Sequence, residues 1–295
     1  MPGETTRYGI VVGVDGSPES SAALQWAGAE ALLFREPVTL VYAVAPTVVS
    51  WPMAPLQDTV VECERQNAEE ALQYARNAVA SVAESCGQDI DIRTEVRYGP
   101  PVQVLVDASR EARMVVVGNR GRGALGRLAL GSVSDGLIHH AHGAVTVVHT
   151  RRGHLPDPAA SVLLGVDGSP ASEDATALAF EEAERRGVDL VAVHVWGDVG
   201  GLPLQGDEWR GHRQQAEEVL AERLAGWQER HPDVRVSRHV EFDDPAHHLV
   251  DRARTAQLVV LGSHGRGGFA GMLLGSVSST VARSVDIPVT VARPR

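Results

Sequence analysis

Two kinds of segment alternate along the chain. Short runs of β-branched and other apolar residues are separated by longer segments in which apolar residues recur at every third or fourth position. The short runs have the length and composition of buried strands, and the longer segments have the spacing of amphipathic helices. Strands that alternate with helices in this way are typical of a parallel sheet covered by helices on both faces.

The runs fall into two sets of five predicted strands. Those of the first set are residues 8–14, 38–44, 90–96, 114–117 and 144–149, and those of the second are residues 161–166, 190–196, 234–240, 258–261 and 288–292. In the first half, helices are predicted at 20–34, 63–85 and 132–141. A further helix is predicted to open at Pro100 and Pro101, because the missing N–H of a proline costs nothing in the first turn.

The two halves also resemble each other in sequence. Residues 11–18 read VVGVDGSP and residues 163–170 read LLGVDGSP. Residues 115–134 (VVVGNRGRGALGRLALGSVS) recur at 259–278 as VVLGSHGRGGFAGMLLGSVS. Such repeats indicate two copies of one domain.

The predicted fold class is therefore α/β. We expect two tandem Rossmann-like doubly wound domains, each a five-stranded parallel sheet with helices on both faces. The predicted boundaries are 1–150 for the first domain, 151–160 for an exposed linker rich in proline, glycine and charge, and 161–295 for the second domain.

Composition excludes several classes of function. The formal net charge is −11 and neither half has an excess of basic residues, so nucleic acid and anionic membranes are not expected as partners. All 27 basic residues are arginine, which excludes Schiff-base chemistry and the lysine of a P-loop. The polar start of the chain and the lack of a long apolar run predict a cytoplasmic protein. Cys63 and Cys86 have no CxxC spacing and are interpreted as idle thiols.

The repeated motifs lie where a doubly wound sheet binds ligands, at the carboxyl ends of its strands. Asp15 and Asp167 follow the first strand of each half, and a glycine-rich loop follows the fourth. Each loop reads Gly-x-x-Gly, nine further residues, then Gly-Ser, at Gly118, Gly121, Gly131 and Ser132 and again at Gly262, Gly265, Gly275 and Ser276. Glycines let the backbone approach phosphate oxygens, and the helix that opens at Gly-Ser favours an anion. Arg120, Arg122, Arg127 and Arg266 are placed to offset phosphate charge.

Each motif also has a purely structural interpretation. The glycines could serve only as turn residues, although two copies with identical spacing favour a ligand site. An aspartate between a strand and a helix is most often a cap or turn residue. A carboxylate beside a phosphate loop is, however, suited to accept hydrogen bonds from an adenine amino group or ribose hydroxyls. The aspartate can act both as a cap or turn residue and as a ligand contact.

Other signals are weaker. The sequence Gly121-x-Gly123-x-x-Gly126 matches a dinucleotide fingerprint but follows the fourth strand instead of the first. Kinase, P-loop and serine-hydrolase motifs are absent from the sequence. The histidines at 139, 140, 142, 247 and 248 are interpreted as surface or helix-end residues, so no metal site and no catalytic residue are predicted.

A strand ending in V-D-G-S, together with G-x-x-G-x9-G-S, resembles the ATP-binding class of universal stress proteins. The resemblance covers nearly the whole chain as two tandem domains. It implies that the aspartate contacts adenosine, that a backbone group at the end of the second strand reads the adenine edge, and that the glycine loop and serine hold ribose and phosphates. The implied nucleotide-binding residues are Gly13, Asp15, Ala43, Gly118, Asn119, Arg120, Gly121, Arg122, Gly123, Gly131, Ser132, Val133 and Ser134 in the first half, and Gly165, Asp167, Val195, Gly262, Ser263, His264, Gly265, Arg266, Gly267, Gly275, Ser276, Val277 and Ser278 in the second.

The function implied is that of an ATP-binding protein that senses or signals in stress or growth arrest, with two ATP per chain, with or without Mg²⁺. A slow ATPase is the alternative, disfavoured because no residue presents itself as a general base for water. A third interpretation is a scaffold that works without nucleotide. The resemblance also implies an unidentified protein partner and a homodimer formed through the final-strand edges, 144–149 and 288–292. Arg120 and His264 occupy matching loop positions, which predicts unequal affinity or pH response.

Overall fold

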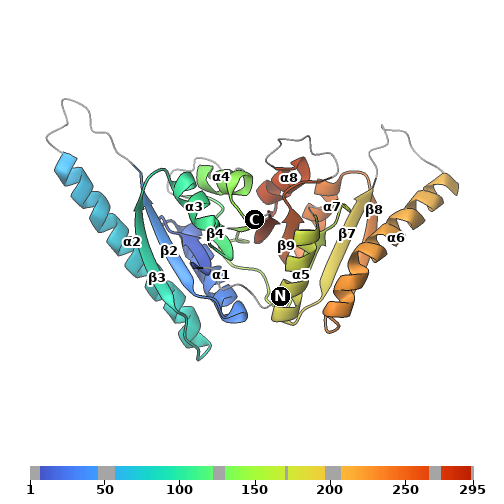
Figure 1. Cartoon of the computed structure of the whole chain (residues 1–295), viewed down its shortest axis with the longest axis horizontal. Helices are drawn as coiled ribbons and strands as arrows, with labels where there is room; N and C mark the ends of the chain where they lie inside the picture. Colours follow the sequence, from blue (N-terminus) through green and yellow to red (C-terminus); the bar gives the residue numbers. More distant parts are fainter. Residues whose placement is uncertain are drawn as a thin grey trace. The chain divides into compact units, whose positions relative to one another are not determined.

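The computed structural model describes residues 7–45, 57–121, 130–169, 172–196, 207–265 and 274–293. The chain divides into two units, the first ending at Val148 and the second beginning at His149 (Figure 1). The elements of the first unit are β1 Ile10–Gly13, α1 Pro18–Phe34, β2 Val38–Val44, α2 Gln57–Ser85, β3 Ile92–Tyr98, α3 Pro101–Ser109, β4 Met114–Gly118, α4 Ser132–His140 and β5 Ala144–Val148.

The second unit repeats this order. Its elements are β6 Ser161–Gly165, α5 Ser172–Arg186, β7 Leu190–Trp196, α6 Asp207–Arg230, β8 Val236–Phe242, α7 Pro245–Arg252, the short 3₁₀ helix η2 Ala253–Thr255, β9 Ala256–Gly262, α8 Ser276–Ser284 and β10 Val289–Ala292. Among these helices, within the described ranges, none is both long enough and apolar enough to span a membrane.

Each unit is a five-stranded parallel sheet. The strand order is β3-β2-β1-β4-β5 in the first unit and β8-β7-β6-β9-β10 in the second. The chain leaves β1 toward β2 and later returns to place β4 on the other side of β1. Right-handed crossovers in opposite directions put helices on opposite faces. The predicted pair of Rossmann-like doubly wound domains is confirmed, and the carboxyl ends of β1 and β4 meet at the switch point of the sheet.

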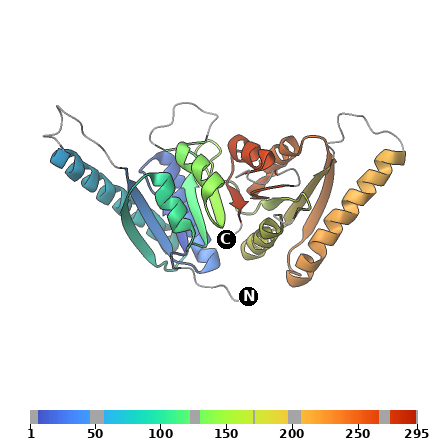
Figure 2. The same cartoon turned by 45° about the horizontal axis from the view of Figure 1, so that its top comes forward.

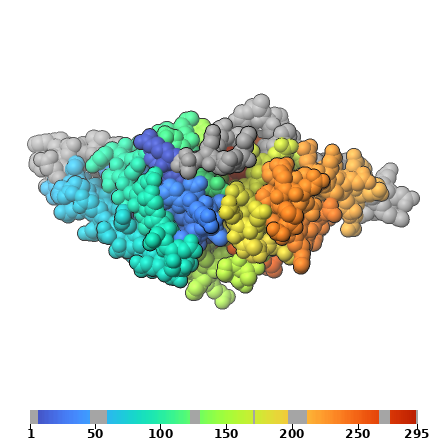
Figure 3. All heavy atoms as spheres, turned by 60° about the horizontal axis from the view of Figure 1, so that its bottom comes forward, coloured from blue at the N-terminus to red at the C-terminus, as the bar shows by residue number. Residues whose placement is uncertain are grey.

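The helices pack in pairs on each sheet. In the first unit α1 packs against α2, and α3 packs against α4 (Figure 2). Figure 3 shows the surface formed by α1 and α2 (blue and cyan) over the first sheet and by α5 and α6 (yellow and orange) over the second. The central strands β1 and β4 are almost completely buried, as their apolar sequences predict.

Strand pairing shifts two of the predicted strands. The strand expected at 90–96 begins at Ile92 and ends at Tyr98, and the one expected at 234–240 runs from Val236 to Phe242. In the first unit the register explains the shift, because β3 pairs residue by residue with β2, from Val38 opposite Ile92 to Val44 opposite Tyr98. The hydrophobic pattern of an edge strand contains no information about where its neighbour begins and ends.

A buried carboxylate occupies the first helix of each unit. Glu30 and Glu182 are both fully buried. Nε of Arg186 lies 3.1 Å from Glu182 Oε2, and Nη1 of Arg186 donates to Gln257 Oε1 at 3.1 Å. Burial of a charge is costly unless it is paired and hydrogen-bonded. Arg186 meets this requirement for Glu182 Oε2, whereas Glu182 Oε1 has no hydrogen-bond partner among the described residues.

The expected linker is exposed over most of its length but forms hydrogen bonds and an ion pair with the second unit. Arg151 forms an ion pair with Asp286 at 2.8 Å and donates to the Arg254 carbonyl at 3.1 Å. Nε2 of Gln257 donates to the Pro158 carbonyl at 2.7 Å. Hydrogen bonds from Arg151 lower the pKa of the Asp286 carboxyl. The segment is therefore held by polar contacts that composition alone does not reveal.

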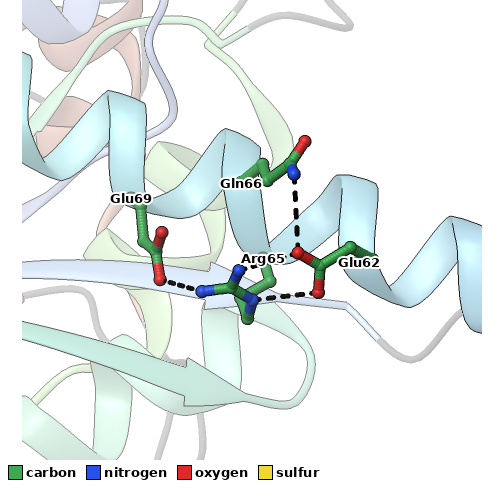
Figure 4. A network of polar contacts seen from close by, with 4 residues as sticks. All are labelled: Glu62, Arg65, Gln66 and Glu69. Carbon is green, nitrogen blue, oxygen red and sulfur yellow. Dashed lines mark hydrogen bonds and ion pairs between the residues drawn. The ribbon is translucent and has the colours of Figure 1, made fainter.

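Helix α2 carries an exposed polar network (Figure 4). Arg65 contacts both Glu62, one turn before it, and Glu69, one turn after it, and Gln66 donates to Glu62 at 3.4 Å. The hydrogen bonds from Arg65 lower the pKa of the Glu62 carboxyl. Exposed pairs at these spacings support helix formation only weakly, so the network serves local helix geometry more than domain stability.

Candidate functional site

The aspartate turn of the first unit links a strand end to a helix start. After β1 ends, the N–H of Val14 donates to the Val41 carbonyl at 2.9 Å. Oδ1 of Asp15 then accepts from the N–H and the hydroxyl of Ser17, at 2.9 and 2.7 Å. Gly16 has φ of 75°, a left-handed conformation that favours glycine. Ser17 caps α1 by accepting from the N–H of Ser20 at 3.1 Å.

The second unit builds the same turn. Oδ1 of Asp167 accepts from the N–H and the hydroxyl of Ser169 at 2.9 and 2.7 Å, and Gly168 has φ of 77°. The N–H of Val166 donates to the Val193 carbonyl at 2.9 Å. One oxygen of each aspartate therefore has the turn role that its position in the sequence suggests. The other oxygen, Oδ2, lies against the glycine loop.

The glycine loop and the aspartate meet at the second glycine of the motif. A β-carbon added to Gly121 would lie 2.4 Å from Asp15 Oδ2, and one added to Gly265 would lie 2.5 Å from Asp167 Oδ2. Any side chain at these positions would have to displace the carboxylate, which the serine of the turn holds in place. Two motifs far apart in sequence are thus in direct contact in both units, as expected for the ends of adjacent strands.

The loop then leads to the start of a helix whose N-cap residue is a glycine and so has no capping side chain. Gly131 is the N-cap residue of α4, and its N–H donates to the Asn119 carbonyl at 2.8 Å. The Ser134 hydroxyl donates to the same carbonyl at 3.0 Å. The first-turn amides of a helix have no intrahelical partner and carry the positive end of the helix dipole. This end of α4 is therefore suited to hold an anion.

The corresponding helix of the second unit begins in the same way. The N–H of Gly275 donates to the Ser263 carbonyl at 2.7 Å, and the Ser278 hydroxyl donates to the Gly262 carbonyl at 2.6 Å. Gly275 is the N-cap residue of α8 and likewise has no capping side chain. Both units thus present a carboxylate, a glycine backbone and a helix N-terminus at one edge of the sheet.

Three other glycines of the predicted set are explained by packing. A β-carbon on Gly118 would lie 2.7 Å from the Glu19 carbonyl group in α1. One on Gly13 would lie 2.9 Å from a methyl of Leu105, and one on Gly165 would lie 2.6 Å from a methyl of Leu261. These glycines allow helix and core side chains to approach the strand ends closely. Their contact with a ligand stays a prediction.

The remaining predicted residues are only partly described. Ala43 and Val195 lie near the ends of β2 and β7, which continue past the ends of β1 and β6 on the edge that carries the aspartate turns. Eight further predicted residues flank the contacts given above, either in the loops or in the first turns of α4 and α8. They are Asn119, Arg120, Ser132, Val133, Ser263, His264, Ser276 and Val277. Arg122, Gly123, Arg127, Arg266 and Gly267 lie outside the described residues.

Sequence reasoning missed two features of this edge. Ser17 and Ser169 fix the aspartates; both stand in the repeated V-D-G-S, which was a usable signal. His194 is buried, and its Nδ1 lies 2.6 Å from the Val166 carbonyl beside Asp167. A polar residue inside the otherwise apolar run LVAVHVW was the available signal for it.

Two cavities in the described structure are lined by residues other than those of the candidate sites. One of about 920 Å³ lies between α6 and β8 and is lined by Trp196, Phe242 and their neighbours. One of about 530 Å³ lies beside Arg7 and Pro37 in the first unit. The candidate sites are assigned from strand-end geometry and hydrogen bonding, because the loops that border them are only partly described.

The chain is similar to known proteins over nearly its whole length. The sequence profile of the Universal stress protein family matches residues 9–149 and 160–293. A universal stress protein of Mycolicibacterium smegmatis is 55% identical over 296 residues, covering 100% of both chains, and one of Mycobacterium tuberculosis (strain H37Rv) is 49% identical, covering 97% of both. The crystal structure of a universal stress protein from Archaeoglobus fulgidus has a TM-score of 0.68 at 23% identity, covering 97% of this chain and 98% of that one, and it shows the shared fold. The chain belongs to the universal stress protein family, as a member with two tandem domains.

Proposed function

We propose that the chain binds one ATP at each of its two strand-end sites and acts as a nucleotide-dependent sensor or signalling protein in stress or growth arrest. One observation carries the proposal. In each unit the described part of the glycine loop packs its backbone on the aspartate carboxylate, and the helix that follows has a glycine, which has no capping side chain, as its N-cap residue.

The chemistry of each part matches a different part of the nucleotide. Glycine backbone and first-turn amides offer N–H donors to phosphate oxygens, and the helix dipole favours their charge. A carboxylate repels phosphate but accepts hydrogen bonds from ribose hydroxyls or the adenine amino group. Because Oδ2 of Asp15 lies at the loop backbone, the nucleoside end of the ligand would sit there and the phosphates would extend toward α4, with or without Mg²⁺.

Slow ATP hydrolysis is the rival function. A general base must be able to reach the attacking water and take its proton. The carboxylates of Asp15 and Asp167 are each held by two hydrogen bonds from a serine and covered on the other side by a glycine. This fixation favours a positioning role over proton transfer, so binding and signalling is the preferred function.

Mass spectrometry of the purified protein, followed by a phosphate-release assay over hours, separates the two functions. Co-purified intact ATP without phosphate release supports the sensor. ADP with steady release supports the ATPase. A protein that carries no nucleotide and binds none on titration would contradict both and favour a scaffold.

Regulation of association is the proposed output. We propose that nucleotide occupancy alters binding to a protein partner and self-association through residues 144–149 and 288–292. Sedimentation velocity with and without ATP tests the self-association, and an unchanged monomer in both conditions would count against it.

A further inference from the structure

In the residues that the structure describes, the two candidate sites have the same backbone arrangement. Each site can therefore serve as the control for the other when the effect of a side-chain difference is measured. The loop-closing hydrogen bond is 2.8 Å from Gly131 N to Asn119 O in the first unit and 2.7 Å from Gly275 N to Ser263 O in the second. The approach of glycine to aspartate is also equal, at 2.4 and 2.5 Å for an added β-carbon. Unequal ligand binding at the two sites would therefore originate in side chains.

The side chains differ at the second position of the loop, where Arg120 corresponds to His264. Both residues are half-buried beside the glycine that opens the helix. A β-carbon on Gly131 would lie 3.2 Å from the Arg120 Cα, and one on Gly275 would lie 3.7 Å from the His264 Cα. Each residue thus lies between the aspartate and the helix N-terminus, where the phosphates are proposed to bind.

Polar contacts at His264 are compatible with both charge states of its ring. Nδ1 of His264 lies 2.9 Å from the hydroxyl of Ser263, a fully buried residue. A hydroxyl can donate to a neutral ring nitrogen or accept from a protonated one. The ring therefore has a defined partner before and after it gains a proton.

Three segments border His264 in the described structure, and two of them contribute a charged group. Asp167 approaches from the β6–α5 turn through its contact with Gly265. Arg293 follows β10, whose last residue Ala292 accepts from the N–H of Ser263. Helix α8, which the structure describes throughout, has no acidic residue in its first turn. The local charges therefore include one acid and one base, and a bound triphosphate would become the dominant charge.

We propose that His264 makes nucleotide binding at the second site depend on pH, whereas Arg120 keeps binding at the first site independent of it. The inference rests on the proposed function. A guanidinium stays protonated at every physiological pH, and an imidazole changes charge between about pH 5 and pH 8. A bound phosphate favours the protonated ring, so the additional affinity is present at low pH and is lost as pH rises.

The test uses variants that each keep one site. Gly121→Val leaves only the second site, and Gly265→Val leaves only the first, because the new side chain must displace the aspartate carboxylate. ATP affinity is measured by calorimetry at about pH 6 and about pH 8 for both variants, and in two buffers of different ionisation enthalpy to count protons taken up. Because the terminal phosphate of ATP itself titrates near pH 6, the quantity of interest is the difference between the two sites.

We expect ATP affinity at the second site to rise about tenfold more than at the first as pH falls from about 8 to about 6, because an imidazole gains charge over this range and a guanidinium does not. Proton uptake should accompany binding only at the second site. His264→Arg should abolish the extra pH dependence, and Arg120→His should confer it on the first site. Equal pH dependence at the two sites, or its survival in His264→Arg, would overturn the inference. Failure of both single-site variants and of the wild type to bind ATP at either pH would instead refute the proposed function.

Discussion

The end of helix α1 offers a stability test with a control inside the same chain. Arg35 is the C-cap residue of α1 and adopts φ of 56° and ψ of 43°, the left-handed conformation. The corresponding residue after α5 is Gly187, with φ of 65°. A left-handed backbone costs a residue with a β-carbon about 1–2 kcal/mol more than it costs glycine. The Arg35 side chain is exposed, so its removal should have little effect on packing.

We expect Arg35→Gly to stabilise the first unit by about 0.5–1 kcal/mol, because the relief of strain is partly offset by the greater freedom of glycine in the unfolded chain. For a domain of this size that gain corresponds to about 1–4 °C in Tm. Gly187→Ala should destabilise the second unit by about 1 kcal/mol. Urea unfolding and calorimetry measure both changes.

The control variant is Arg35→Ala, which removes the same side chain but keeps the β-carbon and therefore the strain. It should leave stability nearly unchanged. If Arg35→Ala stabilises the protein as much as Arg35→Gly does, the gain comes from loss of the arginine side chain and the backbone argument is refuted.

Two further predictions follow from charged contacts in the second unit. Glu182→Gln should lower the free energy of unfolding by about 3 kcal/mol or more, because it removes the charge that Glu182 places beside the nearly buried Arg186. Replacing Glu182 by Leu and Arg186 by Met together should lower it less. A larger loss in the double variant on urea unfolding would contradict this prediction. Arg151 lowers the pKa of the Asp286 carboxyl. The stability that this ion pair contributes should therefore be present above the ordinary aspartate pKa of about 3.9 and be lost as pH falls through the lowered pKa of Asp286. Arg151→Ala should therefore weaken the protein more near neutral pH than in acid, where only the hydrogen bond to the Arg254 carbonyl remains to be lost, and the exposed Arg152→Ala should show no such difference; an equal loss at both pH values would exclude the ion pair as its cause.

The sequence contained enough information to predict the fold and to predict that the repeated motifs meet at adjacent strand ends. Periodicity and repetition identify the parallel strands, and the repeated V-D-G-S and glycine motifs fall at adjacent strand ends by topology alone. The reasons for individual glycines were harder to predict. Gly121 and Gly265 meet the aspartates, but Gly13 and Gly118 are required by Leu105 and by α1, and such contacts exist only after the chain has folded.

Rules that consider only neighbouring residues in the sequence also failed to predict the conformation or role of several residues. Arg35 stands where Gly187 stands in the other unit, so glycine, the residue that most often ends a helix in the left-handed conformation, is present in one copy only. The roles of Ser17 and Ser169 depend on a carboxylate two residues away in a turn that glycine makes possible. Comparison of the two copies of the domain reveals such positions better than either copy alone.

Stoichiometric titration with ATP tests the central claim most directly. Isothermal calorimetry should find two sites per wild-type chain, one in Gly121→Val, one in Gly265→Val and none in the double variant. Gly211→Val, a matched change at a glycine with open space around it, should keep both sites. A stoichiometry that does not change when both loop glycines are replaced, or a folded wild-type protein that ignores adenine nucleotides, would contradict the account.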